Sequence, residues 1–223
     1  MSDTTPGTFY LSKHRLEALT DGIFAVAMTL LVIELKIPET AHITNGEQLV
    51  AALGHLLPKF IAWLISFFVL AIFWVSHHRL FHYVRVVDGK LTWLTIGYLG
   101  CVSLMPFSSA LTGEYGGALV AQTFYSINMA LLGMMALLKS RHIHMHPELC
   151  GPPIPVSVFK GARLRTSGLI VVAAMAIAIT AALPGKGPIG NTAFMLMFVF
   201  GKMGQRIEAR RTAEKSESNF LNT

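Results

Sequence analysis

Apolar residues dominate six stretches of the chain, and glycine, proline or charged residues separate one stretch from the next. Each stretch approaches the length that a helix needs to cross a membrane. The predicted spans are residues 15–36, 56–75, 91–112, 117–138, 168–183 and 189–203. Pro106 is expected to kink the third span, because proline lacks the backbone N–H that a helix interior uses. The pattern predicts an all-α fold with six transmembrane helices in one domain over residues 1–205, followed by a polar tail over 206–223.

Composition supports this class of protein. The 223 residues are 53% hydrophobic and 13% charged, with a mean hydropathy of +0.55, whereas about a quarter of a soluble domain is charged. The chain is therefore expected to be an integral membrane protein. We expect the first apolar stretch to stay in the mature protein, because Glu34, Lys36 and Pro38 follow it in place of a small-residue cleavage site.

The positions of lysine and arginine predict the orientation in the membrane. All but three of the 18 basic residues fall in segments that would lie on one side, namely Lys13, Arg15, Arg79, Arg85, Lys90, Lys139, Arg141, Lys160, Arg163, Arg165, Lys202, Arg206, Arg210, Arg211 and Lys215. Basic loops face the cytoplasm, so both termini are predicted to be cytoplasmic in a multi-pass protein of the cell membrane. The net charge of +6 then reflects orientation and affinity for anionic lipid, and no nucleic-acid partner is predicted.

Two histidine clusters raise the question of a metal site. HHRLFH holds His77, His78 and His82, and HIHMH holds His142, His144 and His146. Both resemble the histidine boxes of membrane di-iron oxygenases and metal transporters, but such a site needs three or four converging imidazoles, usually with carboxylates. The alternating spacing of HIHMH scatters its rings around a helix, and no third box exists. A metal role stays open as an alternative, and no metal ligand or cofactor is predicted. The proline-rich segment 139–165 is expected to be an extended linker.

Residues 15–34, RLEALTDGIFAVAMTLLVIE, form an unusual span. Only 12 apolar or small residues separate Asp21 from Glu34, which covers about 18 Å of a hydrocarbon layer about 30 Å thick. At about 100° per residue, an apolar stripe lies within about 60° of Val26. The stripe consists of Leu19, Ile23, Val26, Leu30 and Ile33, with Thr29 at its edge. Asp21 lies about 140° from Val26 and so points toward neighbouring protein. The pattern alone leaves open whether the stripe meets water, lipid or protein.

The same residues resemble the first-helix signature of the transmembrane-protein-175 family of potassium channels. That signature has an arginine, three residues, Phe-Ser-Asp and then small and branched apolar residues with a threonine. Here Arg15 and Asp21 match, while Leu19-Thr20 replaces Phe-Ser. FWVSHHRLFH, residues 73–82, is a looser match at the end of the second predicted span.

The resemblance implies a homotetramer whose first helices line a central cation pathway. Position by position, it places Val26, Leu30 and Ile33 at a hydrophobic constriction and Thr29 facing the pore. It implies a passive, potassium-preferring channel that is not an enzyme, with potassium as the permeant ion, lipid and its own copies as partners, and no cofactor. An apolar ring demands partial dehydration of the ion, and potassium holds its water less tightly than sodium.

The polar residues at the start of this helix are then interpreted as its cytoplasmic anchor. Arg15, Thr20 and Asp21 would supply the anchor from the first helix, with His77 or His78 of the second span as partners. Two other function classes remain as alternatives, a secondary transporter and a histidine-box enzyme. A transporter is expected to show an inverted repeat with broken helices, and the six spans show no clear pairing of that kind.

Overall fold

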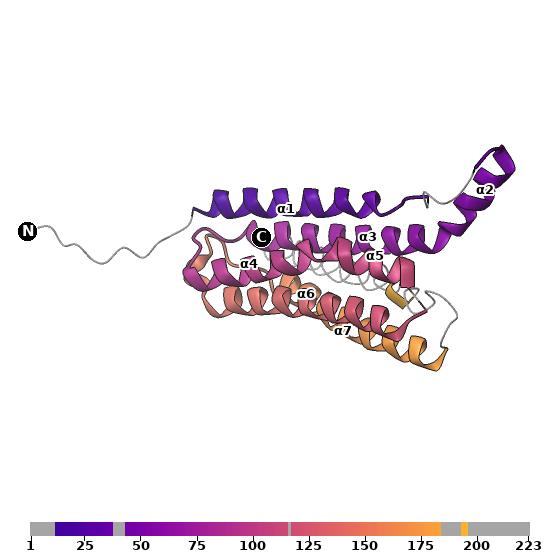
Figure 1. Ribbon diagram of the computed structural model, residues 1–223. Helices are drawn as coiled ribbons and strands as arrows, with labels where there is room; N and C mark the ends of the chain where they lie inside the picture. The colour runs from indigo at the N-terminus through magenta and orange to yellow at the C-terminus, as the bar shows by residue number, and fades with distance from the viewer. Residues whose placement is uncertain (1–11, 38–42, 116, 184–192, 196–223) are drawn as a thin grey trace, which may run out of the picture.

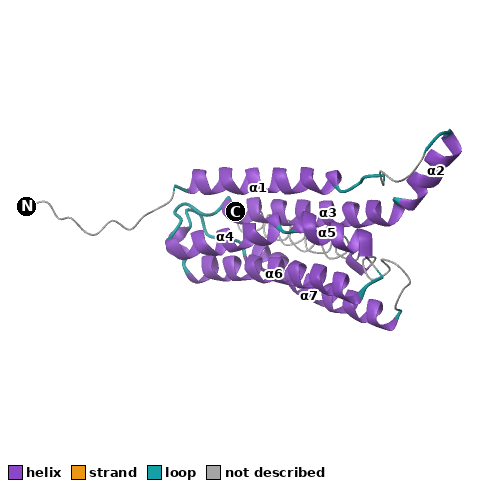
Figure 2. Cartoon of the chain, in the orientation of Figure 1, coloured by secondary structure: helices purple, strands orange, loops and turns teal. Residues whose placement is uncertain are grey.

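The computed structural model describes residues 12–37, 43–115, 117–183 and 193–195, and Figures 1 and 2 show it as a bundle of helices. The helices are α1 (Lys13–Ile33), α2 (Gly46–His55), α3 (Leu57–Phe81), α4 (Gly89–Ser103), α5 (Met105–Tyr115), α6 (Leu119–Met145) and α7 (Val156–Ala182), with short 3-10 helices η1 (Pro147–Leu149) and η2 (Ala193–Met195). These residues form no β-strand, and an isolated antiparallel bridge joins Val84 to Cys150.

Five stretches of helix in the described chain are long and apolar enough to cross a membrane. They are Lys13–Ile33, Leu57–Phe81, Gly89–Tyr115, Leu119–Met145 and Val158–Ala182. The all-α, multi-span fold class is therefore confirmed. The predicted sixth span, residues 189–203, lies outside the described residues except for the short η2.

The extended linker predicted over 139–165 is wrong for most of its length. Helix α6 continues to Met145 and α7 already begins at Val156. The prediction ended each helix where the apolar run ended, but a helix can continue past the hydrocarbon layer with polar residues on its exposed turns. Proline is what interrupts the helices here, because Pro147 and Pro155 flank the segment between them.

Local sequence explains how several other helices begin and end. The side chain of Asn45 accepts a hydrogen bond from the Gln48 N–H at the start of α2, at 2.9 Å. Asp88 caps α4 in the same way, by accepting from the Leu91 N–H at 2.8 Å. The third span breaks between α4 and α5 at Leu104, close to Pro106, which agrees with the expected kink.

Helix α1 lies along one side of the bundle and packs on α3, α4 and α5, whereas α7 lies on the opposite side against α6 (Figure 1). The main apolar core draws residues from all of these helices. A smaller apolar cluster joins the start of α1 to the loop after α3 and the end of α6. Polar side chains inside the bundle also pair with one another, because the hydroxyl of Ser66 contacts those of Ser109 and Tyr125 at 2.8 and 3.0 Å.

Helices α6 and α7 approach closely at Gly133. A methyl group added at this position would lie 3.2 Å from Leu169 Cδ2 and 3.4 Å from Thr166 Cγ2. Such small residues are what allow membrane helices to pack at short distance. Gly100 on α4 is a natural contrast, because a methyl group there would meet nothing within 4 Å.

We predict that Gly133→Val destabilises the bundle, because the side chain would push α7 away from α6. Overpacking of this kind costs about 1–3 kcal/mol, which corresponds to a fall in Tm of roughly 2–4 °C per kcal/mol for a chain of this size. Thermal unfolding of the purified protein measures the effect. The control Gly100→Val should melt within about 2 °C of the parent. Equal losses in the two variants would show that Gly133 is not a tight contact.

Candidate functional site

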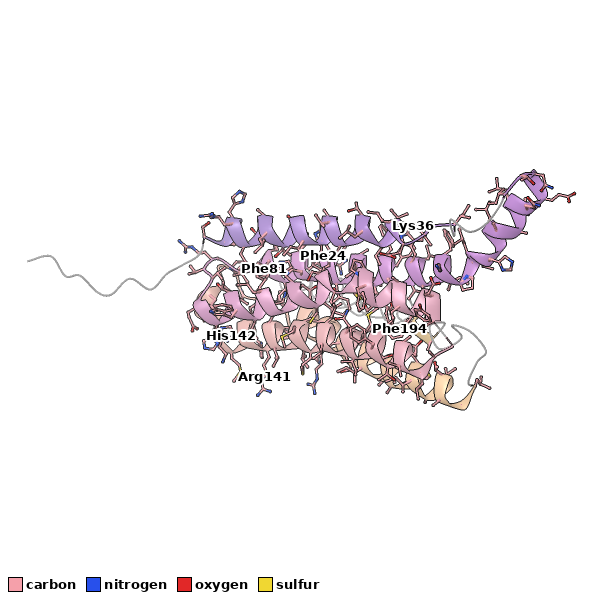
Figure 3. The ribbon with its side chains drawn as sticks, viewed as in Figure 1. Phe24, Lys36, Phe81, Arg141, His142 and Phe194 are labelled. Carbon is pink, nitrogen blue, oxygen red and sulfur yellow. The ribbon has the colours of Figure 1, made fainter. Side chains whose placement is uncertain are left out.

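Helix α1 has one packed face and one bare face within the chain. Its buried residues recur at helical spacing on the side toward the bundle: Leu16, Thr20, Phe24, Ala27 and Leu31. Phe24, labelled in Figure 3, packs its ring 5.8 Å from that of Tyr98. The sequence alone showed a stripe around Val26 but could not say which face of α1 packs. The structure places the packed face about 120° away from Val26.

The stripe predicted from the sequence lies on the bare face. Val26, Leu30 and Ile33 are 56%, 42% and 50% exposed, and Thr29 beside them is also exposed. Large apolar side chains that are exposed along one face of a helix mark a surface that contacts another apolar surface or borders a narrow space. The three residues that the resemblance assigns to a constriction and the pore-facing Thr29 thus lie together on one free surface of the chain.

The hydroxyl of Thr29 is held by its own helix. It donates to the carbonyl oxygens of Ala25 and Val26 at 3.0 and 2.9 Å. Because the proton is used inside the helix, the hydroxyl oxygen can present only its lone pairs outward. An acceptor of this kind suits a cation or the oxygen-bound hydrogen of a water molecule, and it does not suit an anion.

Asp21 faces α3 and makes two contacts there. Its Oδ1 accepts a hydrogen bond from Trp74 Nε1 at 2.9 Å and lies 3.3 Å from His78 Nε2. Trp74 and His78 are one helical turn apart on α3, and their rings meet edge to face with centroids 4.6 Å apart. The contacts fix the rotation of α1 against α3, which turns the stripe away from the bundle.

The other predicted anchor residues lie elsewhere. The buried hydroxyl of Thr20 donates to the Leu16 carbonyl oxygen of its own helix at 2.8 Å, and Arg15 is exposed. His77 is buried and its Nδ1 contacts Lys139 Nζ at 3.0 Å. Within one chain, therefore, Asp21 and His78 come together, and His77 belongs to a different cluster.

The HIHMH cluster lies at the end of helix α6 and divides between two faces. His142 and His146, one turn apart, have ring centroids 4.2 Å apart, whereas His144 packs against Phe159. His142 Nε2 contacts Asp88 Oδ2 at 2.9 Å. Figure 3 labels His142 at the end of the bundle where α1 begins.

These contacts lower the pKa of Asp88. Burial alone would raise the pKa of this carboxyl, but the Leu91 N–H, the hydrogen bond from His142 and the charges of His142 and His146 together lower it. Asp88 is thereby held as a carboxylate that links the start of α4 to the end of α6. Among the described residues, no three His, Cys, Asp or Glu side chains are placed to hold a metal ion.

Comparison with known proteins gives the geometry a context. A model of the family described as the endosomal/lysosomal potassium channel TMEM175 matches residues 15–106, which run from the start of α1 into α5. A Streptomyces collinus protein named as a potassium channel is 34% identical over 155 residues, which cover 68% of this chain and 74% of that protein. The chain belongs to the TMEM175 family. This is a family of ion channels and not of enzymes.

Other TMEM175 relatives match over a smaller share of their length. The mouse protein, Mus musculus, is named as an endosomal/lysosomal proton channel and is 34% identical over 47% of this chain and 22% of its own. Two further bacterial relatives are matched over about half of their length. A crystal structure of a TMEM175 homologue from Chamaesiphon minutus, described as that of a lysosomal potassium-selective channel, superposes with a TM-score of 0.67. It is 27% identical and covers 86% of this chain and 97% of its own.

Two residues of this region were missed by the sequence analysis. Trp74 supplies the hydrogen bond to Asp21, and Lys139 supplies the contact to His77. A signal for Trp74 did exist, because it precedes His78 by four residues within the FWVSHHRLFH match and so shares its helical face. No sequence pattern pointed to Lys139, since its partner lies 62 residues away.

We predict a graded loss of stability at Asp21. The Asp21 and His78 side chains are 47% and 42% exposed, so Asp21→Asn, which keeps an acceptor for Trp74, should cost no more than about 1 kcal/mol. Asp21→Ala leaves the Trp74 N–H without its partner and should cost about 1–3 kcal/mol. Thermal melting of purified protein measures both effects.

The matched control for Asp21 is Glu17, an acidic residue one turn earlier that contacts Lys13 at 3.5 Å. Glu17→Ala should change stability by less than about 0.5 kcal/mol, as is usual for an ion pair four residues apart along one helix. If Glu17→Ala and Asp21→Ala melt alike, the contact with Trp74 does not hold α1 in place.

Proposed function

We propose that the chain is a potassium-preferring cation channel, a homotetramer in which the bare faces of four α1 helices surround a central pore. The observation that carries this proposal is the exposure of Val26, Leu30 and Ile33 on a helix whose other face is packed. One chain contributes a single such helix, so several copies around an axis are needed to enclose a path. The short apolar run between Asp21 and Glu34 suits a helix surrounded by protein and pore water.

The spacing of the stripe supports a narrow, apolar path. Val26, Leu30 and Ile33 follow one another at about 6 and 4.5 Å along the helix axis, so four helices would stack three apolar rings. Thr29 would add a ring of oxygen acceptors. An ion that passes apolar rings must shed part of its water, which favours potassium over sodium. Narrow apolar rings also expel water, so the same residues can serve as the gate.

The names of the relatives support an ion channel and bear on the choice of ion. The Streptomyces collinus relative is named as a potassium channel, and the mouse relative as a proton channel. The lone-pair face of Thr29 and the apolar rings fit a dehydrating univalent cation. Potassium as the main permeant ion is therefore our proposal for this chain.

The arrangement of charge supports a cell-membrane location with both termini in the cytoplasm. Lys13 and Arg15 begin α1, and Arg141 lies near the end of α6. Figure 3 shows Arg141 and His142 toward the end of the bundle where α1 starts, and Lys36 beyond the far end of α1. One basic end and one less basic end fit the positive-inside rule and contact with anionic lipid. The chain needs no nucleic acid and no cofactor for this role.

The anchor of α1 is part of the proposal. Asp21 and His78 hold the helix against α3 within one subunit. Arg15 is exposed and would reach an acidic group across the subunit interface. Thr20 and His77, both buried, would act indirectly by fixing the packed faces of α1 and α3.

Ion flux from liposomes and the mass of the purified protein test the proposal together. In liposomes with a potassium gradient and no other energy source, the protein should release potassium faster than it releases sodium under the matching gradient. The mass in mild detergent and in bilayers should be four times that of the 24.4 kDa chain. A stable monomer, or flux that requires a second coupled ion gradient, would rule out this pore, and the second result would indicate a transporter.

The constriction itself predicts the effect of a polar side chain. Leu30→Ser should hydrate the ring, raise cation flux about tenfold or more and lower the preference for potassium, because about 1.4 kcal/mol of barrier corresponds to a factor of ten. Liposome flux of potassium and sodium measures both changes. The matched control is Val32→Ser, because Val32 is also exposed, at 49%, but points about 120° away from Val26. Unchanged selectivity in Leu30→Ser channels of normal assembly would contradict the hydrophobic constriction.

A further inference from the structure

A recess lies between α1, α3 and α5, at the end of the bundle where α1 ends and α3 begins (Figure 1). Its volume is about 390 Å³, which is within the range of small-molecule sites, about 300–1,000 Å³. Much of its wall is apolar or aromatic and is formed by Leu31, Leu35, Trp63, Phe107, Leu111 and Tyr115. A molecule with an apolar part therefore fits this recess better than a bare ion does.

Three charged side chains also line the recess, and two of them pair with each other. The three are Glu34, Lys59 and Glu114, and the Lys59 ammonium forms an ion pair with the Glu114 carboxylate. Helices α3 and α5 approach closely at this pair, because a methyl group added at Gly113 would lie 3.3 Å from both Cα and Cγ of Lys59. The positive charge in the wall is thus already matched by a neighbouring carboxylate.

Glu34 supplies the charge that is left over. It directly follows the last residue of α1, and it takes part in none of the ion pairs that the described residues form. Two carboxylates and one ammonium give the recess a surplus of one negative charge. The aromatic wall residues Trp63, Phe107 and Tyr115 add to this preference, because the faces of aromatic rings attract cations. The recess therefore favours a cation over an anion or a neutral molecule.

We propose that the recess binds an amphipathic ammonium compound, with its ammonium beside Glu34 and its apolar part against Leu31 and Phe107. A divalent metal ion fits less well, because the described residues offer no group of three His, Cys, Asp or Glu side chains to hold one. The required chemistry occurs in free organic amines and in the ethanolamine headgroup of a phospholipid. The bound compound would tie the end of α1 to α3 and α5. The site lies within one chain and does not depend on the proposed pore.

Thermal melting with two matched probes tests whether the recess selects the charge. Phenethylammonium carries an aromatic ring and an ammonium, and phenethyl alcohol has nearly the same shape without the charge. A ligand that binds the folded state stabilises it by mass action. At equal ionic strength, phenethylammonium at about ten times its Kd should raise the Tm of the detergent-purified protein by roughly 3–6 °C. Phenethyl alcohol at the same concentration should not raise it.

The variant Glu34→Gln removes the surplus charge and keeps the shape of an exposed side chain. It should abolish the rise in Tm with phenethylammonium. The control Glu47→Gln alters an exposed carboxylate of α2 that does not line the recess, and it should keep the rise of the parent. The proposal is overturned if the parent responds to neither probe, if phenethyl alcohol raises the Tm equally, or if Glu34→Gln keeps the full rise. The two parent measurements do not depend on the folding of any variant.

A pair of short-chain phospholipids identifies the source of the ammonium. Dihexanoyl phosphatidylethanolamine carries the ammonium, and dihexanoyl phosphatidylglycerol lacks it. If the ethanolamine lipid alone raises the Tm of the parent and loses this effect in Glu34→Gln, the headgroup of a membrane lipid is the occupant. If phenethylammonium raises the Tm and neither lipid does, the occupant is a free amine from the water phase. Both results support recognition of an ammonium by Glu34.

Discussion

The structure depends on the division of α1 into a packed face and a bare face. Leu16, Phe24 and Leu31 are almost fully buried against the bundle, and the van der Waals packing of this face holds α1 within the chain. The hydrogen bond from Trp74 to Asp21 also sets the rotation of α1 about its own axis, because it ties one side of the helix to α3. With the rotation fixed, Val26 and Leu30 have no place in the core and must meet something outside the chain.

The rest of the bundle serves as a rigid support for that helix. Helices in lipid have no hydrophobic driving force to associate, so they rely on close packing and on hydrogen bonds between helices. The hydroxyl pair of Ser66 and Ser109 and the close approach of α6 to α7 at Gly133 are examples of these two contacts. At the end where α1 begins, Asp88 joins α4 to α6 through His142. In the proposed channel, the bare faces of several copies come together around one axis.

The sequence predicted the parts of this account that follow from periodicity and local chemistry. The helical stripe around Val26, the turn of Asp21 toward neighbouring protein and the break near Pro106 all rest on neighbours within a few residues. The predictions failed where polar residues continue a helix, as in α6 beyond residue 138, since hydropathy marks the membrane and does not mark the helix end. Sequence also could not choose between His77 and His78, which lie about 100° apart on α3. Only the structure shows that His78 meets Asp21 of α1 and that His77 meets Lys139 of α6.

The central claim is that the bare face of α1 borders the path of the ion. Silver, a univalent cation that binds thiolates, reports this directly when single cysteines are placed along α1 in a protein whose Cys101 and Cys150 have been replaced by serine. The account predicts that silver rapidly stops potassium flux in liposomes for Val26→Cys, Leu30→Cys and Ile33→Cys, and leaves flux unchanged for Ala27→Cys and Val32→Cys. If silver instead stops potassium flux through the Ala27→Cys or Val32→Cys channels, or through none of the five variants, the claim that this face lines the pore is contradicted.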